Sequence, residues 1–333
     1  MPSSPACTAT NPKASTSYLN SSKLLAKLTM LLAMLSVFFV LPLSAQTGDW
    51  IWSGGNKTLL QGQYAALGWP GVYGTLGVAS PANAPGARTA VAKWVDSHGN
   101  FWMFGGNGLD ANGTGSYLND LWEFSSSTGE WTWVAGNSTV PAYLKPRPGV
   151  YGSLGVPAPG NAPGGREGGV TWTDHDGNLW LFGGFGTDSV GAVSSELNDL
   201  WQFNPATTQW TWMGGVSTFG TSETYLGVYG TVGIPAATDS PGSRYGSESW
   251  TDANGNLWLF GGYGVGSSLG YIGELNDLWE FNPSTFEWTW MSGTARTNAL
   301  GIYGTLGAPS AANYPGGRQN GVSWTDNSGN FWL

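Results

Sequence analysis

Cysteine, histidine and basic side chains are all scarce in this 333-residue sequence. Cysteine occurs once, at Cys7, and the only histidines are His98 and His175. A chain that loses its first residues on export therefore has no disulfide, no thiolate metal site and no cysteine nucleophile. Lysine and arginine total 12, against 21 acidic residues. A nucleic-acid-binding surface needs clustered Lys and Arg, so the composition argues against nucleic acid as a partner.

The first 45 residues are predicted to form a signal peptide. They carry three lysines but no acidic residue, and an apolar run extends over residues 28–43. That run is short for a bilayer span, and it ends in Leu43-Ser44-Ala45, a sequence of the kind that signal peptidase accepts. The stretch before the apolar run is long for a signal, so an uncleaved membrane anchor stays open as the alternative.

Export would leave a strongly acidic chain. Residues 1–45 contain three basic and no acidic side chains, so nine basic against 21 acidic side chains remain, a formal charge of −12. We expect the protein to be secreted, periplasmic or on the cell surface, with no membrane contact beyond the export signal. Without disulfides its stability must come from its own core, and the 288 remaining residues are enough to form one.

Internal repetition is the strongest pattern in the sequence. A glycine doublet, a tyrosine and an arginine each return at intervals of 78 residues, and the last interval for the tyrosine and the arginine is 74. The doublets begin at Gly105, Gly183 and Gly261, the tyrosines are Tyr73, Tyr151, Tyr229 and Tyr303, and the arginines are Arg88, Arg166, Arg244 and Arg318. A period this regular predicts stacked copies of one supersecondary unit.

Each copy is predicted to form four antiparallel strands, named a to d. In the third copy, two aromatic-rich runs surround the turn 252–256, which is rich in Asp, Asn and Gly, and this is the pattern of a hairpin. Further on, Trp279 and Phe281 alternate with a period of two in strand c. Trp288 and Trp290 do the same in strand d, so both members of each pair lie on one face. The predicted fold class is all-β.

The unit resembles a kelch repeat, with the glycine doublet closing strand b, an aromatic residue in strand c and a tryptophan in strand d. The resemblance covers residues 48–333, although kelch repeats are usually about 50 residues long and these are 78. It implies a β-propeller of the secreted bacterial type within the galactose-oxidase-like kelch superfamily. Its four-stranded blades would pack radially around a central channel.

The copies predict three full blades and part of a fourth. The full blades are residues 88–134, 166–213 and 244–291, and the partial blade is residues 318–333. Residues 49–53 match an isolated strand d. In kelch-like propellers such a strand commonly completes the last blade, so residues 46–333 are expected to be a propeller fragment truncated at its C-terminus. A natural four-bladed ring closed by that strand is the alternative.

Tryptophan is abundant, and 19 of the 20 tryptophans fall at equivalent positions of the copies. Large aromatic side chains that recur in every blade are expected to fill the packing between blades, rather than to bind sugars. Trp69 is the exception, because it has no counterpart.

The two ends of each blade are expected to differ in function. Antiparallel connectivity places the short a–b and c–d turns at one end, the turn end, and the longer b–c loops and d–a links at the other, the loop end. Function usually lies on loops held by a rigid scaffold. One position of the d–a link changes its side chain from copy to copy, as an asymmetric ligand requires. We therefore predict ligand-binding residues at Trp69, Arg147 and Tyr225, where the last copy has Ala299.

The repeated arginines have two interpretations. Arg88, Arg166, Arg244 and Arg318 begin strand a, which lies nearest the axis of a propeller, so they could form a ring at the channel mouth that attracts an anion. Alternatively, each arginine pairs with an aspartate of strand c, and the candidates are Asp120, Asp199 and Asp277. The ion-pair interpretation is favoured, because a buried charge without a partner is costly.

No catalytic residue, metal site or cofactor is predicted. Galactose oxidase belongs to the kelch-like propellers, and the resemblance would imply a copper site of histidines, tyrosines and a crosslinked cysteine. Here the two histidines fall in a–b turns, away from the loop end, and the exported chain has no cysteine. The Asp-rich turns lack the downstream glutamate of an EF-hand. Four loop carboxylates, at Asp110, Asp188, Glu196 and Glu274, could form an acid/base pair, but the sequence singles out no two of them.

The sequence favours a recognition module that is not an enzyme. Its partner would be a glycan or an extracellular protein bound at the loop end, the face of the b–c loops and d–a links. The alternative is a galactose-oxidase-like copper radical oxidase or another glycan-processing enzyme, whose site would be completed by C-terminal blades beyond residue 333.

Overall fold

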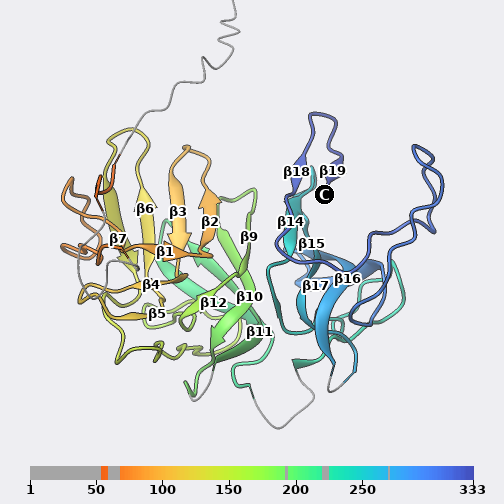
Figure 1. Ribbon diagram of the computed structural model, residues 1–333, viewed down its shortest axis with the longest axis horizontal. Helices are drawn as coiled ribbons and strands as arrows, with labels where there is room; N and C mark the ends of the chain where they lie inside the picture. The colour runs from red at the N-terminus through yellow and green to blue at the C-terminus, as the bar shows by residue number, and fades with distance from the viewer. Residues whose placement is uncertain (1–53, 59–67, 192–193, 220–224, 269–270) are drawn as a thin grey trace, which may run out of the picture. The chain divides into compact units, whose positions relative to one another are not determined.

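The computed structural model describes residues 54–58, 68–191, 194–219, 225–268 and 271–333. The predicted signal peptide, residues 1–45, and the predicted strand at 49–53 lie outside the described residues. Every regular element of the described part is a β-strand (Figure 1), and all the strand pairs are antiparallel. That part contains no helix long and apolar enough to cross a membrane.

The second blade shows the repeating unit most clearly. Strand a is split into β8 (Arg166–Glu167) and β9 (Val170–Thr173), strand b is β10 (Leu179–Thr187), strand c is β11 (Ser194–Asn204) and strand d is β12 (Gln209–Gly214). Both parts of strand a pair with β10, which pairs with β11, and β11 pairs with β12. The prediction of four-stranded antiparallel units is confirmed.

The other copies follow the same order. The third blade consists of β13 (Arg244–Tyr245), β14 (Glu248–Thr251), β15 (Leu257–Val265), β16 (Ile272–Asn282) and β17 (Glu287–Ser292). The first blade consists of β1 (Arg88–Thr89), β2 (Ala92–Val95), β3 (Phe101–Phe104), β4 (Asn107–Leu109), β5 (Gly115–Tyr117), β6 (Leu121–Phe124) and β7 (Trp131–Ala135).

The fourth copy contains two short strands, β18 (Trp324–Thr325) and β19 (Phe331–Trp332). They pair with each other in a hairpin. Among the described residues, no strand pairing joins this hairpin to the first blade.

In the second and third blades the glycine doublet does not close strand b, contrary to the sequence-based expectation, whereas in the first blade β3 ends just before the doublet and β4 begins after it. Strand β10 continues through Gly183 and Gly184 to Thr187, with a β-bulge between Phe182 and Gly184. Both glycines have positive φ, 61° and 104°, a conformation that glycine adopts without steric cost. A Cβ atom on Gly183 would also collide with the carbonyl oxygen of Arg244 in the next blade. The doublet therefore bends the strand, and strands b and c reach beyond it into the predicted b–c loop.

Tryptophans of the complete blades fill the space between neighbouring blades, as predicted. One core cluster combines Trp94 and Trp102 of the first blade with Trp201, Phe203 and Trp210 of the second. A second cluster joins the second blade to the third in the same way. Indole N–H groups also cross between blades, as in the bond from Trp94 Nε1 to the Trp180 carbonyl at 2.9 Å. These side chains supply both the apolar area and the registration of one blade on the next.

Backbone hydrogen bonds tie the copies together beside strand a. The amides of Gly168, Gly246 and Asn320 each donate to the equivalent carbonyl of the preceding copy, at 2.8, 2.9 and 2.8 Å. The acceptor for Gly168 is the carbonyl of Ala90. Ala90 and the three donor residues all have positive φ. One residue per copy thus forms a continuous hydrogen-bonded series.

The d–a link before each blade covers the outer edge of that blade's strand d. In the second blade Ala158 forms a bridge with Trp210, and the amide of Gly155 donates to the Trp212 carbonyl at 2.8 Å. Asn161 Nδ2 donates to the Trp210 carbonyl at 3.1 Å. The first and third blades repeat the bridge at Ser80–Trp131 and Ala236–Trp288. The link thus occupies a strand edge that would otherwise be open, which uses much of the length beyond a usual kelch repeat.

Candidate ligand-binding site

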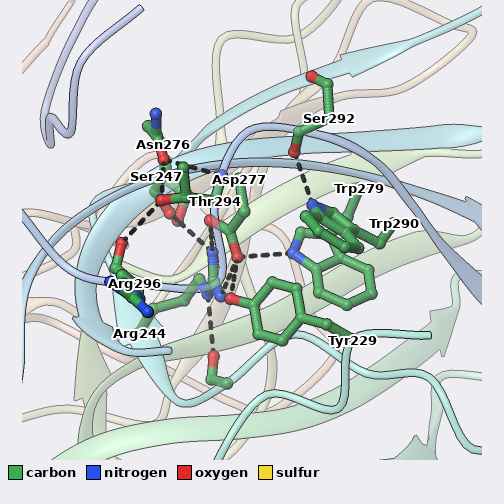
Figure 2. A network of polar contacts seen from close by, with 12 residues as sticks. Tyr229, Arg244, Ser247, Asn276, Asp277, Trp279, Trp290, Ser292, Thr294 and Arg296 are labelled. Carbon is green, nitrogen blue, oxygen red and sulfur yellow. Dashed lines mark hydrogen bonds and ion pairs between the residues drawn. The ribbon is translucent and has the colours of Figure 1, made fainter. Parts of the chain in front are cut away.

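The repeated arginine of each complete blade is held in a buried polar network. Figure 2 shows the third blade, where Arg244 meets Asp277, Tyr229 and Trp279. Two guanidinium nitrogens donate to the two carboxylate oxygens of Asp277 at 2.7 and 2.8 Å. The Tyr229 hydroxyl and the Trp279 indole N–H donate to Oδ2 of the same carboxylate, at 2.6 and 2.7 Å. The carboxylate thus accepts four hydrogen bonds, and two backbone carbonyls accept the remaining guanidinium contacts.

The first and second blades repeat this network. The shortest nitrogen–oxygen distance is 2.6 Å for both Arg88–Asp120 and Arg166–Asp199. The ion pairs favoured by the sequence are therefore present in all three complete blades. The three arginine side chains are between 0% and 4% exposed, so an anion attracted to them would have to reach buried groups.

The network sets the protonation of its members. Burial, followed by the negative charge of Asp199, raises the pKa of Tyr151 well above its usual value, so the phenol stays a neutral donor. Burial alone would lower the pKa of Arg166, but the charge of Asp199, its hydrogen bonds and the contribution of Tyr151 together outweigh burial, and the pKa is raised. These groups are fixed in one charge state, which suits a structural role.

The three predicted ligand-binding residues lie at equivalent backbone positions of the d–a links. The carbonyls of Trp69, Arg147 and Tyr225 each accept the amide of the residue before the repeated arginine, at 2.8, 2.9 and 2.9 Å. Ala299 does the same in the fourth copy, at 2.9 Å. The backbone therefore repeats while the side chain changes.

Each of the three side chains has a local contact. Trp69 Nε1 donates to the Thr58 carbonyl at 2.6 Å. Arg147 Nε donates to the Thr139 carbonyl at 3.0 Å, and the ring of Tyr225 packs on Phe219 with centroids 5.2 Å apart. All three are half-buried. Ligand binding by these residues remains a prediction.

The candidate loop carboxylates have different surroundings. Asp110 is buried and accepts the amides of Asn112 and Thr114 within its loop and that of Val140 in the d–a link. Asp188 repeats this arrangement in the second blade, where it accepts the amide of Phe219 at 2.6 Å. These two carboxylates clamp the b–c loop onto the d–a link, and their oxygens are occupied by backbone donors.

The histidines lie in a–b turns, where both are exposed. An aspartate organises each of these turns. In the first blade, Asp96 accepts two backbone amides through Oδ1, and the side chains of Asn100 and Trp102 through Oδ2. The same bonds recur at Asp174, Asp252 and Asp326. The Asp-rich sequence is thus explained by hairpin turns that also orient a tryptophan.

A set of residues lies where strands b and c pass the glycine doublet, and the sequence analysis named only two of its members, the carboxylates Glu196 and Glu274. In the second blade Phe185 pairs with Glu167 on one side and Glu196 on the other. The corresponding residues are Thr89, Asn107 and Tyr117 in the first blade, and Tyr245, Tyr263 and Glu274 in the third. We call these nine residues the loop-end row. Direct cross-strand partners share one face of a sheet, so each blade presents its three side chains together.

The aromatic members of the loop-end row contact one another across blades. Ring centroids are 5.6 Å apart for Tyr117 and Phe185, and 6.0 Å apart for Phe185 and Tyr245. Tyr245 and Tyr263 follow at 5.6 Å within the third blade. All four rings are half-buried, so each keeps part of its surface open. They form a connected aromatic surface across three blades.

Carboxylates lie beside this aromatic surface. Burial, followed by the charge of Glu167, raises the pKa of Tyr117, and burial followed by the charge of Glu196 raises that of Tyr245. Burial also raises the pKa of Glu167 itself. Aromatic faces with a few polar acceptors are the usual lining of a small-molecule site. The arrangement can pack against the apolar face of a sugar ring and accept hydrogen bonds from its hydroxyls.

Two signals in the sequence could have revealed the loop-end row. The alternation of strand b continues beyond the doublet, and no row position carries the same residue in all three copies, although the second and third share glutamate in strand c. The expectation that the doublet ends the strand placed these residues in a loop instead. In the described ranges, no group of three or more His, Cys, Asp or Glu side chains is positioned to hold a metal ion.

No family model matches the sequence, and no curated protein matches it. A solved structure described as that of YjhT is similar, with a TM-score of 0.41 and 16% sequence identity. The similarity covers 74% of this chain and 58% of that one, so this chain spans less than two thirds of that protein's length.

Proposed function

We propose that this protein is a noncatalytic recognition module with a kelch-like propeller fold, and that it binds a glycan through the loop-end row. The observation that carries the proposal is the contrast between repeated and changing residues. Tyrosines, arginines and tryptophans that repeat in the complete blades are engaged in packing and ion pairs. Aromatic and acidic residues that differ between blades gather at one end of the strands.

Sugar chemistry fits this combination. Tyr117, Phe185 and Tyr245 offer half-buried aromatic surface, and Glu167 lies near two of these rings. A glycan presents apolar C–H faces and hydroxyl donors, which suit aromatic rings and carboxylate acceptors respectively. The predicted export signal agrees with a glycan outside the cytoplasm or on a cell surface, and an extracellular protein is the other partner class that the test addresses.

The test measures binding of the full chain to a broad panel of immobilised glycans. We expect Tyr245→Ala and Glu167→Gln each to weaken the affinity for the most tightly bound glycan by about tenfold or more, which corresponds to about 1.4 kcal/mol. Phe101→Ala is the matched control, because Phe101 is a 50% exposed aromatic residue at the turn end. Equal binding by all four proteins would place the glycan elsewhere, and absence of glycan binding would favour a protein partner.

A separate arm tests the residues predicted from the sequence. The triple variant Trp69→Ala, Arg147→Ala, Tyr225→Ala removes the changing side chains of the d–a links. Loss of glycan binding in this variant, with retained folding by circular dichroism, would extend the site from the loop-end row to the links. Unchanged binding would confine the site to the row.

A glycan-processing enzyme is the second candidate, and one observation favours it. Glu167 and Glu196 flank Phe185 on adjacent strands, so their side chains share one face of the sheet. Burial raises the pKa of Glu167, as a general acid requires, and most glycosidases use two carboxylates. Release of reducing ends from the bound glycan, abolished in Glu167→Gln, would favour the enzyme. Binding without release would favour the recognition module.

A further inference from the structure

The third blade departs from the other two at the loop end. The residue five positions after the start of each glycine doublet is Asp110 in the first blade, Asp188 in the second and Gly266 in the third. The two aspartates clamp the b–c loop to the d–a link through backbone amides. In all three blades the next residue of the b–c segment also donates its amide to the d–a link, and the third blade keeps this bond, from Ser267 to the Ala295 carbonyl at 2.9 Å. The carboxylate of the clamp is absent.

A cavity lies at this position. Its volume is about 360 Å³, and it is lined by Gly266, Ser268, Tyr271, Ala295, Arg296 and Thr297. That volume is at the small end of the range for ligand pockets, roughly 300–1,000 Å³. A side chain on Gly266 would collide with the Ala295 carbonyl. Glycine at this position therefore removes the carboxylate clamp and leaves this wall of the cavity without a side chain.

The charge of this position is reversed in the third blade. Arg296 stands where the first two blades have Thr139 and Thr218. Together with the change from aspartate to glycine, this replaces a negative side chain by a positive one. Arg296 is exposed, and within the described ranges its side chain is in no ion pair. Its backbone is held in place, because Thr294 Oγ1 donates to the Arg296 carbonyl at 3.2 Å (Figure 2).

The remaining lining residues suit a sugar. Tyr271 is 70% exposed at the edge of the cavity and can stack on a pyranose ring. Ser268 and Thr297 add hydroxyls that both donate and accept hydrogen bonds. A guanidinium recognises a carboxylate through two parallel hydrogen bonds. An aromatic ring, hydroxyls and one cation together match a sugar that carries a carboxylate.

We propose that this third-blade pocket binds the carboxylate of an acidic sugar, with Arg296 as the anion-binding residue and Tyr271 as the stacking residue. The site is distinct from the loop-end row and does not depend on the row's binding a ligand. The nearest member of the row along strand b is Tyr263, three residues before Gly266, or about 10 Å in an extended strand. Two adjoining sites of different charge would select a glycan that has an acidic unit beside a neutral one.

The experiment compares methyl β-D-glucuronide with methyl β-D-glucoside, by ligand-observed NMR titration of the full chain. We expect the glucuronide to bind about tenfold more tightly than the glucoside, as a charge-assisted hydrogen bond predicts. Arg296→Thr, which installs the residue of the other two blades, should abolish that preference. Lys145→Thr removes the same charge from an exposed site on another link and should keep it.

Three outcomes would overturn the proposal. They are a wild-type chain that binds neither sugar, an Arg296→Thr variant that keeps the preference, and sodium acetate that binds as tightly as the glucuronide. In the last case the pocket would be a simple anion site. Tyr271→Ala should weaken the binding of both sugars but not the binding of acetate. Tyr245→Ala should leave the preference intact, so failure of the loop-end row and failure of this pocket are distinguishable.

Discussion

The second blade and the fourth copy carry the same tyrosine and arginine in different surroundings. In the second blade Arg166 is buried against Asp199, and Tyr151 is 5% exposed. In the fourth copy Arg318 donates to the Gly316 carbonyl and to the Tyr303 hydroxyl at 3.4 Å, while Tyr303 is 69% exposed. The described part of the fourth copy has two strands, β18 and β19, which correspond to strands a and b. It therefore does not include the strand c that carries the aspartate in the complete blades.

The comparison shows that the aspartate of strand c organises each complete blade. Asp199 accepts four hydrogen bonds from groups on strand a, the d–a link and strand c itself. The arginine and tyrosine are buried only where this acceptor is present. Tryptophans follow the same rule, since Trp324 and Trp332 are 51% and 49% exposed while Trp172 and Trp180 are 3% and 0% exposed. Repeated residues become a core only when the neighbouring strands are in place.

The largest effect is expected for Asp199→Asn. An asparagine turns a donor group toward the donors of Arg166, Tyr151 and Trp201, and it leaves the guanidinium buried without a counter-charge. Breaking a buried ion pair in this way costs about 3–5 kcal/mol. Urea unfolding followed by tryptophan fluorescence measures the change. Arg318→Met is the matched control and should change stability by less than about 0.5 kcal/mol, so equal losses in the two variants would contradict the comparison.

An intermediate effect is expected for Tyr151→Phe. The change removes one of the four donors to buried Asp199 and should cost about 1–3 kcal/mol. Tyr303→Phe alters an exposed hydroxyl, so its unfolding free energy should be close to that of the wild type. A Tyr303→Phe variant as unstable as Tyr151→Phe would show that burial of the network is irrelevant.

The same tyrosine predicts an alkaline loss of stability. The folded pKa of Tyr151 is raised above the usual 10.0, so above pH 10 the unfolded chain releases this proton first and stability falls as pH rises. Each such tyrosine contributes about 1.4 kcal/mol per pH unit in that range. The Tyr151→Phe variant should therefore lose stability less steeply than the wild type between pH 10 and 11. If the unfolding free energies of the wild type and of Tyr151→Phe fell equally steeply between pH 10 and 11, Tyr151 would not be a buried neutral phenol.

The smallest effect is expected at the a–b turns. Asp252 accepts two backbone amides and the side chains of Asn256 and Trp258. Burial acts to raise the pKa of Asp252, but these hydrogen bonds outweigh it and lower the pKa, so the stabilisation is lost as pH falls below about 4. Asp252→Ala should cost about 1 kcal/mol in the unfolding free energy at pH 7.

The fourth copy provides the control for this turn. Asp326 makes the same hydrogen bonds, but it lies on an exposed hairpin. Asp326→Ala should leave the urea midpoint unchanged. A shift as large as that of Asp252→Ala would mean that local turn geometry, rather than packing between blades, sets the contribution.

Much of the fold could be predicted from the sequence because the repeat multiplies each local signal. Alternation in strands c and d, the Asp-Asn-Gly turns and the 78-residue spacing all specify local structure, and the strands agree with them. The pairing of Arg166 with Asp199 followed from the cost of a buried charge. Ligand binding by Trp69, Arg147 and Tyr225 followed only from variability, and it remains a prediction.

The loop-end row and the third-blade pocket were not predicted from the sequence for a specific reason. Both depend on how far strand b continues after the glycine doublet, and Gly183 and Gly184 look the same in sequence whether they end a strand or bend it. The carbonyl of Arg244, contributed by the next blade, leaves no room for a side chain on Gly183. That contact exists only in the folded chain.

The sequence by itself determined the all-β class, the strand pattern of each copy and the residues available for the core, because these depend on local periodicity and turn chemistry. Tertiary structure decided which of the repeated residues are buried, since Arg166 needs Asp199 from a distant strand. It also decided which changing residues meet, because Tyr117, Phe185 and Tyr245 come from three blades. These contacts join residues 60 to 68 positions apart, so they arise from the packing of whole blades, and no local preference encodes them.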